Sequence, residues 1–526
     1  MRISLSAAFV LAAWAFFSPS PARAKGYELG WRPEETVFRW PGSAGDGYAA
    51  TVYKNRAYVA DVATVRAGDR SYSEIRFSTN RSGKWERTLV AKIPDDPNTG
   101  GPLPQIAVIP ASGRVVIVVI HPKSNGAEFV SYTNASGTWT PTAAPAAGGG
   151  PDAFVNPTSL SLAADGSEAT LAFNASSQDT NCPGQGAYIY LSHLKDGAPA
   201  WTGAKNVTAD YCGAKGGFAK NPVLVLSGGK DFLAYQCSGD PNGSPGAMCL
   251  RSGDLGGTSE EIVETNTPDW GMAPGLYALA VDGGAPTLAY VMNQNNQLRL
   301  MTARKDSAGW KRTQLATGGS PKTSQALSLA PAIAAEAARA LVAYVGYAAW
   351  PLGGNNSQAV YMTAEETSGS FTKPWNFTRS KNSDAAPVLA SSDGFTHLFI
   401  ERDGQSLLWS RQEPVPIIAA EASSRGLRAE LKGTIAPASA PENLRICLEQ
   451  IVPGKPGSRE TWKRLGCDET KTAPENGRAS FTTTWPKLAP GRYRARVEAG
   501  LNDEHLARRG AWNSVVVADA ATSERR

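Results

Sequence analysis

Residues 78–85 read "STNRSGKW", a polar turn that ends on a tryptophan. The phrase, a serine three residues before an aromatic, recurs as "SGTW" (136–139), "SAGW" (307–310) and "SGSF" (368–371), with a looser copy, "DGAPAW" (196–201). A short β-rich pattern precedes each copy and another follows it. Serine and glycine favour tight turns, and aromatic residues favour strands. The phrase therefore predicts a hairpin whose second strand begins at the aromatic.

A second phrase alternates with the first. It opens on a proline, passes through a turn and ends in an apolar run, and its copies begin at Pro104, Pro157, Pro222, Pro274, Pro331 and Pro387. Residues from Ala50 fit one period upstream without the proline. A repeat of roughly 50 to 60 residues with four short strands is typical of a β-propeller blade. The repeat also assigns the alanine-rich residues 326–350 to two strands rather than a helix.

The repeats predict an all-β chain with a β-propeller over residues 31–413. Seven units begin near residues 50, 104, 157, 222, 274, 331 and 387, so a seven-bladed β-propeller is expected, with six or eight blades as the alternatives. The seventh unit ends after its third strand, and residues 35–40, "ETVFRW", resemble the missing fourth one. Placing both chain ends in one blade would leave no open sheet edge.

The stretch 78–85, S-x-N-x-S-x-x-W, resembles the Asp-box, S-x-D-x-G-x-x-W, of the sialidase-like (BNR-repeat) propellers. Asn80 and Ser82 stand where the motif has Asp and Gly, and the copy at 132–139 keeps the asparagine, the serine and the tryptophan. The resemblance covers roughly residues 30 to 413. It implies a hairpin between the third and fourth strands of a blade, away from the active face. It also implies that these aromatic side chains fill the gaps between blades: Trp85, Trp139, Trp201, Trp310 and Phe371.

The catalytic half of the family pattern is weaker in this chain. Sialidases place an arginine in a Phe/Tyr-Arg-Ile-Pro motif near the start of the propeller, and this sequence has none. No positions in this sequence match the tyrosine nucleophile of sialidases or its paired glutamate. The same holds for the three arginines that bind the substrate carboxylate. The resemblance therefore implies the fold and a carbohydrate-related role, and it does not extend to sialidase activity.

The first 24 residues read as a secretory signal peptide. A basic start at Arg2, an 11-residue apolar run and "ARA" before Lys25 predict cleavage near Ala24 and a secreted or periplasmic product. No other run is expected to span a membrane, because 326–350 contains proline and charged residues. The formal charge of +5 falls to about +3 without the signal peptide, which is too low to indicate nucleic acid as a partner.

Six cysteines in an exported chain indicate disulfides. Their spacing favours three local pairs, although six cysteines allow other connectivities: Cys182 with Cys212, Cys237 with Cys249, and Cys447 with Cys467. The sequence has no C-x-x-C motif, so it indicates neither a zinc ribbon nor a thioredoxin-like redox site, and no metal or other cofactor is expected.

A second domain is expected after the propeller. Proline and small polar residues over 414–426 predict a linker, and alternating strands over 427–519 predict a small β-sandwich, followed by a flexible tail at 520–526. The stretch "LAPGRYRARV" (488–497) resembles the entry to a late strand in fibronectin- and immunoglobulin-like modules, which implies that Tyr493 anchors a corner.

The candidate site residues come from the loops that join blades and from the loops between second and third strands. HExxH, G-x-S-x-G, Walker A and G-x-G-x-x-G are absent. Acids that precede blade starts, with aromatic or cationic neighbours, suit sugars, because carboxylates accept hydroxyl hydrogen bonds and flat rings stack on sugar faces. An aspartate at such a position also often caps its own turn. The candidates are Asp46, His121, Asp152, Asp210, Tyr211, Asp269, Trp270, Trp350 and Asp384.

These residues lead to one main hypothesis and two alternatives. The main hypothesis is an exported, carbohydrate-facing protein that binds or cleaves glycans on the loop face, and any catalysis would be glycoside hydrolysis or polysaccharide lysis. A non-catalytic envelope scaffold that holds a protein partner is the principal alternative. A propeller lyase would instead use a cluster of histidine, tyrosine and arginine.

Overall fold

The computed structural model describes residues 29–518 with internal gaps. The gaps are 41–46, 68–69, 95–102, 124–125, 135–136, 147–151, 153, 180–186, 212–216, 239–246, 254, 256–259, 266–276, 295–296, 318–330, 337–338, 348–357, 368–369, 379–382, 439, 453–460, 501–504 and 506. The expected signal peptide and the expected tail lie outside this part of the chain. Within it, every long element is a strand, and no helix is long and apolar enough to cross a membrane.

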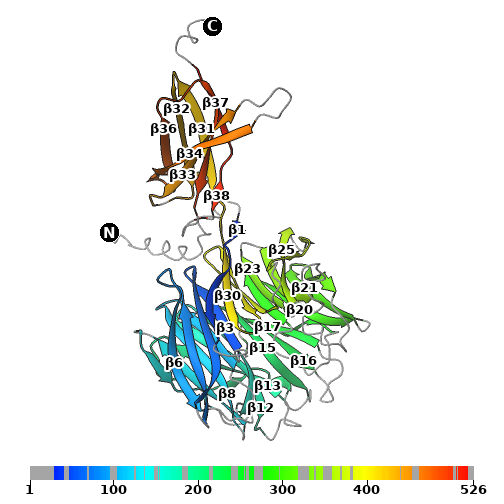
Figure 1. Cartoon of the computed structure of the whole chain (residues 1–526). Coiled ribbons are helices and arrows are strands. Elements are labelled where there is room, and N and C mark those ends of the chain that lie inside the picture. Colours follow the sequence, from blue (N-terminus) through cyan, green and yellow to red (C-terminus); the bar gives the residue numbers. More distant parts are fainter. Residues whose placement is uncertain are drawn as a thin grey trace, which may run out of the picture. The chain divides into compact units, whose positions relative to one another are not determined.

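The chain divides into two compact units. One is Glu34–Ser410, and the other contains Arg411 onward together with the residues before Glu34. In the larger unit, four-stranded antiparallel sheets follow one another in chain order (Figure 1). The first is β3 (Gly47–Tyr53), β4 (Arg56–Ala67), β5 (Arg70–Thr79) and β6 (Glu86–Pro94), and the second is β7 (Leu103–Ile109), β8 (Arg114–Lys123), β9 (Gly126–Asn134) and β10 (Trp139–Thr142).

The next three sheets repeat the same strand order. The third is β11 (Phe154–Asp165), β12 (Glu168–Ser177), β13 (Ala187–Lys195) and β14 (Lys205–Asn206), followed by the 3-10 turn η3 (Ala209–Tyr211). The fourth is β15 (Phe218–Ser227), β16 (Lys230–Ser238), β17 (Ala247–Gly253) and β18 (Glu260–Glu264). The fifth is β19 (Tyr277–Asp282), β20 (Ala285–Gln294), β21 (Gln297–Asp306) and β22 (Gly309–Thr317).

Two further sheets complete the series in the described residues. The sixth is β23 (Pro331–Glu336), β24 (Arg339–Tyr347) and β25 (Gln358–Thr367) with β26 (Ser370–Phe371) and β27 (Trp375–Asn376), so the alanine-rich stretch does form two strands. The seventh is β28 (Asp384–Ser392), β29 (Phe395–Arg402) and β30 (Ser406–Pro414), with β1 (Leu29–Trp31) and β2 (Glu35–Arg39) paired to β30.

The sheets form a closed ring. The first strand of each sheet contacts the first strand of the next, and β28 of the seventh sheet contacts β3 of the first. Strand β2, from the start of the chain, supplies the outer strand of the seventh sheet by pairing with β30. The larger unit is therefore a β-propeller. A seven-bladed propeller requires seven consecutive sheets of this kind. The blade count stays a prediction.

The hairpins quoted from the sequence have a common geometry. In the first sheet, Asn80 Oδ1 accepts a 2.8 Å hydrogen bond from the backbone N–H of Ala57, which ties the β5–β6 turn to β4. In the second sheet, Asn134 Oδ1 accepts one of 2.7 Å from the backbone N–H of Gly137. Gly83 and Gly137 both have φ of +87°, a conformation that a side chain disfavours. The asparagine and the glycine therefore shape the turn that places the aromatic.

Each of three aromatic side chains from these hairpins packs against the sheet before its own. The rings of Trp85 and Trp409, on the first and seventh sheets, lie 5.5 Å apart edge to face. Trp139 makes the same kind of contact with Phe77 of the first sheet at 5.1 Å. Trp201 is 6% exposed and donates a 3.0 Å hydrogen bond from Nε1 to Ser131 Oγ of the second sheet. Aromatic burial thus joins neighbouring sheets.

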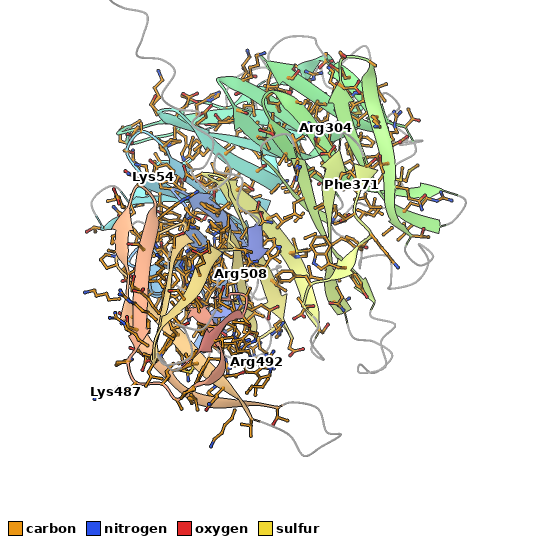
Figure 2. The ribbon with its side chains drawn as sticks, turned by 90° about the horizontal axis from the view of Figure 1, so that it is seen from above. Lys54, Arg304, Phe371, Lys487, Arg492 and Arg508 are labelled. Carbon is orange, nitrogen blue, oxygen red and sulfur yellow. A yellow bond between two sulfur atoms is a disulfide. The ribbon has the colours of Figure 1, made fainter. Side chains whose placement is uncertain are left out.

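Ion pairs join other sheets. Arg304 Nη1 of the fifth sheet lies 2.6 Å from Glu365 Oε2 of the sixth, whose carboxylate also accepts the N–H of Ala340. Figure 2 labels Arg304 of the fifth sheet and Phe371 of the sixth. Glu365 is only 2% exposed, so this pair is part of the interior between the two sheets.

The smaller unit contains two sheets around one core. One has the order β31 (Ile417–Arg425), β32 (Arg428–Ala436), β36 (Arg478–Trp485), β35 (Ala473–Glu475). The other has the order β34 (Thr461–Lys471), β33 (Asn443–Val452), β37 (Gly491–Ala499), β38 (Arg508–Arg509), with β39 (Asn513–Val517) also paired to β37. Leu431 and Phe481 of the first meet Ile446 and Val497 of the second in that core. Tyr493 is 1% exposed and donates a 2.7 Å hydrogen bond to the Ala489 carbonyl, the corner contact that its motif implies.

The expected linker at 414–426 is wrong. Residues 417–425 form β31, which pairs along its whole length with β32. Its alternate residues Ile418, Ala420 and Ala422 pack against the core of this unit, while the residues between them are exposed. The small side chains that suggested a linker are the inward residues of an edge strand, so the sandwich begins about ten residues earlier than expected.

Replacing Trp201 tests whether aromatic burial joins the sheets. Trp201→Ala is expected to reduce the free energy of unfolding by about 3 to 5 kcal/mol, because it leaves a large cavity. Trp201→Phe keeps most of the buried area and loses the Ser131 hydrogen bond, so it should cost about 1 kcal/mol. Guanidinium denaturation measures both. An unchanged midpoint for Trp201→Ala would contradict this role.

Candidate functional site

The described candidate residues all lie at one edge of their sheets. Asp152 and Asp210 are in segments that join a fourth strand to the next first strand, Asp384 is the first residue of β28, and His121 is near the end of β8. The sheets repeat one strand order around the ring, so these edges form one face, which we call the loop face. Six of the sequence candidates lie outside the described residues: Asp46, Asp269, Trp270, Trp350, Cys182 and Cys212.

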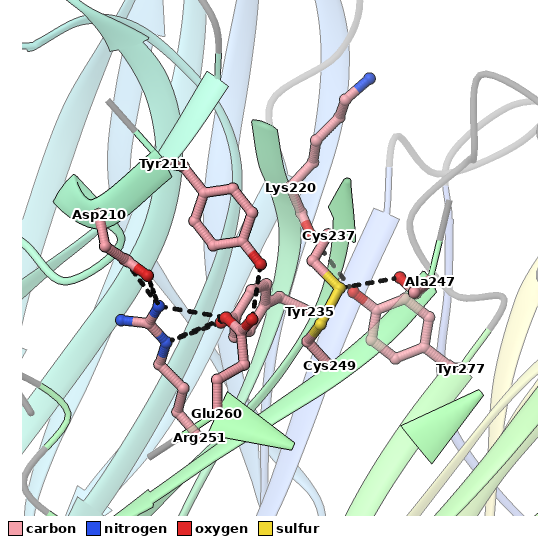
Figure 3. Close-up of a disulfide and its surroundings, with 10 residues drawn as sticks. All are labelled: Asp210, Tyr211, Lys220, Tyr235, Cys237, Ala247, Cys249, Arg251, Glu260 and Tyr277. Atoms are coloured by element: carbon pink, nitrogen blue, oxygen red, sulfur yellow. Dashed lines mark hydrogen bonds and ion pairs between the residues drawn. A yellow bond between two sulfur atoms is a disulfide. The ribbon is translucent and has the colours of Figure 1, made fainter. Parts of the chain in front are cut away.

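Asp210 and Tyr211 belong to a network of hydrogen bonds around the buried Arg251 (Figure 3), in which Asp210 itself is exposed. Arg251 Nη2 donates to both carboxylate oxygens of Asp210, at 2.7 and 2.9 Å, and to Glu260 Oε2 at 3.1 Å. Its Nη1 donates to the carbonyl of Val207, on the segment that follows the third sheet. Because Arg251 lies on β17, this side chain links the fourth sheet to the third.

Two tyrosines complete the network. Tyr211 donates a 2.8 Å hydrogen bond to Glu260 Oε1, and Tyr235 donates to Glu260 Oε2. Burial, and then the Glu260 carboxylate, raise the pKa of Tyr211 well above its ordinary value. Burial also raises the pKa of Tyr235, although the Arg251 charge opposes it. Both phenols stay protonated, and Tyr235 and Arg251 are 0% and 4% exposed, so these groups hold the sheets together and face no substrate.

A disulfide lies beside this network. Cys237 and Cys249 join β16 to β17, and Tyr235 pairs directly with Cys249 in the same ladder. The Cys447–Cys467 disulfide joins β33 to β34 in the smaller unit. Both pairs confirm the pairing expected from spacing, and no described cysteine is free.

Asp152 and His121 lie on other sheets and are not brought together. Asp152 Oδ1 accepts a 2.6 Å hydrogen bond from the backbone N–H of Asn206 at the end of the third sheet. His121 is 5% exposed, and its Nδ1 lies 3.5 Å from Glu128 Oε1. Burial acts to raise the pKa of Glu128, but its pairing with Lys123 at 2.5 Å and with His121 lowers it below the usual range. Asp152 thus ties the segment before β11 to β14, the last strand of the same sheet.

Asp384 shares one arginine with a second carboxylate. Arg402 Nε donates a 2.7 Å hydrogen bond to Asp384 Oδ1, and its Nη2 lies 2.9 Å from Glu34 Oε2. The Asp384 side chain is fully buried, whereas that of Glu34 is 24% exposed. Burial raises the pKa of Glu34 in spite of the Arg402 charge. The end of the seventh sheet therefore carries two acids and one cation.

Glu401 adds a third acid at the same edge. It precedes Arg402 on β29, so its side chain points to the opposite face of the sheet, toward the first sheet. It makes no hydrogen bond or ion pair with any described residue, and burial raises its pKa. Burial, and then the Glu401 charge, raise the pKa of Tyr48 of β3, whose hydroxyl donates to the Ala386 carbonyl. A half-buried carboxyl with a raised pKa is suited to general acid chemistry.

The sequence search missed Glu34, Glu401 and Arg402. It considered acids just before blade starts, whereas Glu401 and Arg402 end a second strand, immediately before the "DGQ" turn at 403–405. That turn was the sequence signal that could have pointed to Glu401 and Arg402.

Among the described residues, no group of three or more histidine, cysteine, aspartate or glutamate side chains is placed to hold a metal ion.

Comparison with known proteins finds similar folds only. No family model matches the chain, and no curated protein matches it. Among solved structures it is similar to Trypanosoma rangeli sialidase, with 10% identity over 78% of this chain and 88% of that one and a TM-score of 0.37. It is also similar to Penicillium chrysogenum α-L-arabinanase, with 13% identity over 63% and 98% and a TM-score of 0.39, and to leech intramolecular trans-sialidase, with 11% identity over 72% and 70% and a TM-score of 0.37. Sequence identities and TM-scores this low say nothing about the activity of this chain.

Removing Arg251 tests the structural role of the buried network. Arg251→Met leaves the Asp210 and Glu260 carboxylates without their partner and should reduce the free energy of unfolding by about 3 to 5 kcal/mol. Arg81→Met, at an exposed turn residue, is the control and should change it by less than about 0.5 kcal/mol. Denaturation midpoints of the two variants should differ clearly, and equal midpoints would contradict the role.

The raised pKa of Glu401 predicts a pH dependence of stability. Between the unfolded value near 4.5 and the higher folded value, the folded chain holds a proton that the unfolded chain releases. The stabilisation from this group is complete below the unfolded pKa and is lost as pH rises through the folded pKa. Wild type should therefore lose stability relative to Glu401→Gln as pH rises from 4 toward 8. If the melting temperatures of wild type and Glu401→Gln changed in parallel across that range, the raised pKa of Glu401 would be contradicted.

Proposed function

We propose that this chain is an exported protein that binds or cleaves glycans through the loop face of its propeller. One observation carries the proposal: the seventh sheet ends in Glu34 and Glu401, two partly exposed carboxyls whose pKa burial raises, beside Arg402 and Tyr48. Acids, a cation and an aromatic hydroxyl at one edge suit the hydroxyl-rich surface of a sugar.

In the catalytic form of this proposal, the protein is a glycoside hydrolase with Glu401 as its acid. The protonated carboxyl would donate to the glycosidic oxygen as the bond to the sugar carbon breaks. A second carboxylate would then activate water or attack the sugar, and no second acid is assigned, because Glu34 pairs with Arg402 on the other face of the sheet. A polysaccharide lyase is the other enzymatic form, and sialidase activity is not proposed.

Export and the remaining loop residues belong to the same proposal. The N-terminal signal pattern ending near Ala24 and the two disulfides of the described chain support an oxidising compartment outside the cytoplasm. Asp46, Asp269, Trp270 and Trp350 remain proposed contributors to the loop face, because their positions in the repeat place them in its connecting segments.

A non-catalytic envelope scaffold is the second candidate. The observation that favours it is that polar side chains bond within the propeller: Arg251 pairs with Asp210, Tyr211 donates to Glu260, and these contacts join two sheets. Asp152 likewise accepts a hydrogen bond from the backbone of Asn206. A ring whose polar groups serve its own cohesion could present its loops to a protein partner instead of a glycan.

An array of neutral, acidic and sialylated glycans tests the proposal. Saturable binding by the wild-type chain that Glu401→Gln weakens about tenfold would support it, since loss of one hydrogen bond between the carboxyl and the sugar is worth roughly that much. Glu168→Gln is the matched control, because Glu168 lies at the opposite edge of the third sheet. If the folded protein bound no glycan on the array, or if both variants lost binding equally, the proposal would be contradicted and the scaffold would be favoured.

A further inference from the structure

The outer face of the β34–β33–β37 sheet carries an array of arginines and tryptophans that the propeller proposal does not use. Along β33 and β37 the inward residues, such as Ile446 and Val497, are buried in the core, so the alternate residues point outward. The outward residues of these strands and of β34, β38 and β39 define this face. Its arginines are Arg445, Arg464, Arg492, Arg494, Arg496 and Arg509, and Arg492 is labelled in Figure 2.

Arg494 is held at the centre of the face. Its guanidinium lies 4.3 Å from the ring centroid of Trp462 and 4.2 Å from that of Trp512. Its Nε and Nη2 both donate to Glu449 Oε2, at 2.9 and 2.6 Å. Arg496 stacks on the same Trp512 at 4.4 Å. Stacking on aromatic faces fixes a guanidinium in place, which lowers the entropy lost when it binds an anion.

Charge on the face is unbalanced. Its acids are Glu449, Glu469 and Glu498, so the six arginines exceed the glutamates by three. Arg445 is exposed and makes no hydrogen bond or ion pair with any described residue, and Arg464 lies 3.9 Å from Glu449 with half its side chain exposed. At the other edge, Arg509 Nε lies 3.3 Å from Glu498 Oε1, and 70% of the Arg509 side chain is exposed. Guanidinium donors thus remain free for an external anion at both edges of the sheet.

We propose that this face binds an acidic polysaccharide. Guanidinium groups pair bidentately with carboxylate and sulfate, and the exposed parts of the tryptophan rings can cover the apolar face of a sugar ring. The face spans neighbouring strands, which lie about 4.8 Å apart, so an extended polymer could contact side chains of several strands at once. The three interleaved glutamates break the continuous positive surface that a nucleic-acid backbone or an anionic membrane would favour.

Binding of the full chain to defined polymers tests this proposal. The probes are polygalacturonate for carboxylate, dextran sulfate for sulfate and neutral dextran as the uncharged reference. Saturable, salt-sensitive binding to either acidic polymer is expected, and binding to only one of them identifies the anion. Arg445→Gln with Arg464→Gln should weaken that binding at least about tenfold.

The controls separate this face from other sites. Arg478→Gln, an exposed arginine on the other sheet of the unit, should leave binding unchanged, and so should Glu401→Gln on the propeller. Every substituted arginine is exposed, so the melting temperatures of these variants should match wild type. This measurement checks that each variant is folded. The proposal would be overturned if the chain did not bind the acidic polymers, or if it bound neutral dextran equally well. Tighter binding to duplex DNA or to phosphatidylglycerol vesicles, or an equal loss of binding in Arg478→Gln, would also overturn it.

Discussion

The propeller depends on filling the wedge-shaped gaps between its sheets. Each sheet carries apolar side chains that pack against those of a neighbouring sheet. The tryptophan that follows the Asp-box-like turn reaches that gap, as Trp85, Trp139 and Trp201 do. The asparagine and glycine of the turn are needed because they set where the second strand, and hence the aromatic, begins. One short sequence phrase therefore determines both a local hairpin and a long-range contact.

Closure of the ring makes the strongest demand on this packing, because the first and seventh sheets are far apart in sequence. Trp409 contacts Trp85 and donates a 3.0 Å hydrogen bond to His397 Nδ1. The other nitrogen of His397 lies 2.9 Å from Asn55 Oδ1 of the first sheet, so that nitrogen carries the proton and donates. Arg87 stacks 4.0 Å from the Phe38 ring on the same junction. Along the chain the first sheet follows only β2 of the seventh, so these contacts hold it to β29 and β30, which come from the far end of the propeller sequence.

The fourth sheet has no tryptophan after its third strand, and polar groups together with two tyrosines join it to the third sheet. At the junction of the third and fourth sheets, Arg251 bridges to Asp210 and Val207. This arrangement explains why two residues that looked like ligand-binding candidates have a structural role. An aspartate before a blade start and an arginine on a middle strand can form a buried pair as readily as an open site, and the sequence does not contain the distance that decides between them.

The repeat made most of the strands predictable, because period and turn chemistry agree over several copies. Propensity alone failed at 417–425, where small residues suggested a linker but alternate residues reach a core that is built from distant strands. Glu401 could not be found in the same way, since its raised pKa comes from burial against the first sheet, which is far away along the chain. Disulfide pairing succeeded for Cys237–Cys249 and Cys447–Cys467, because each pair closes a short loop between adjacent strands.

A crystal structure of the chain with a bound oligosaccharide would test the central claim most directly. The account predicts a sugar at the loop face, with a hydroxyl or glycosidic oxygen within hydrogen-bond distance of the Glu401 carboxyl and close to Tyr48. A sugar bound only at the opposite edge of the propeller, where the Asp-box-like turns lie, would contradict it.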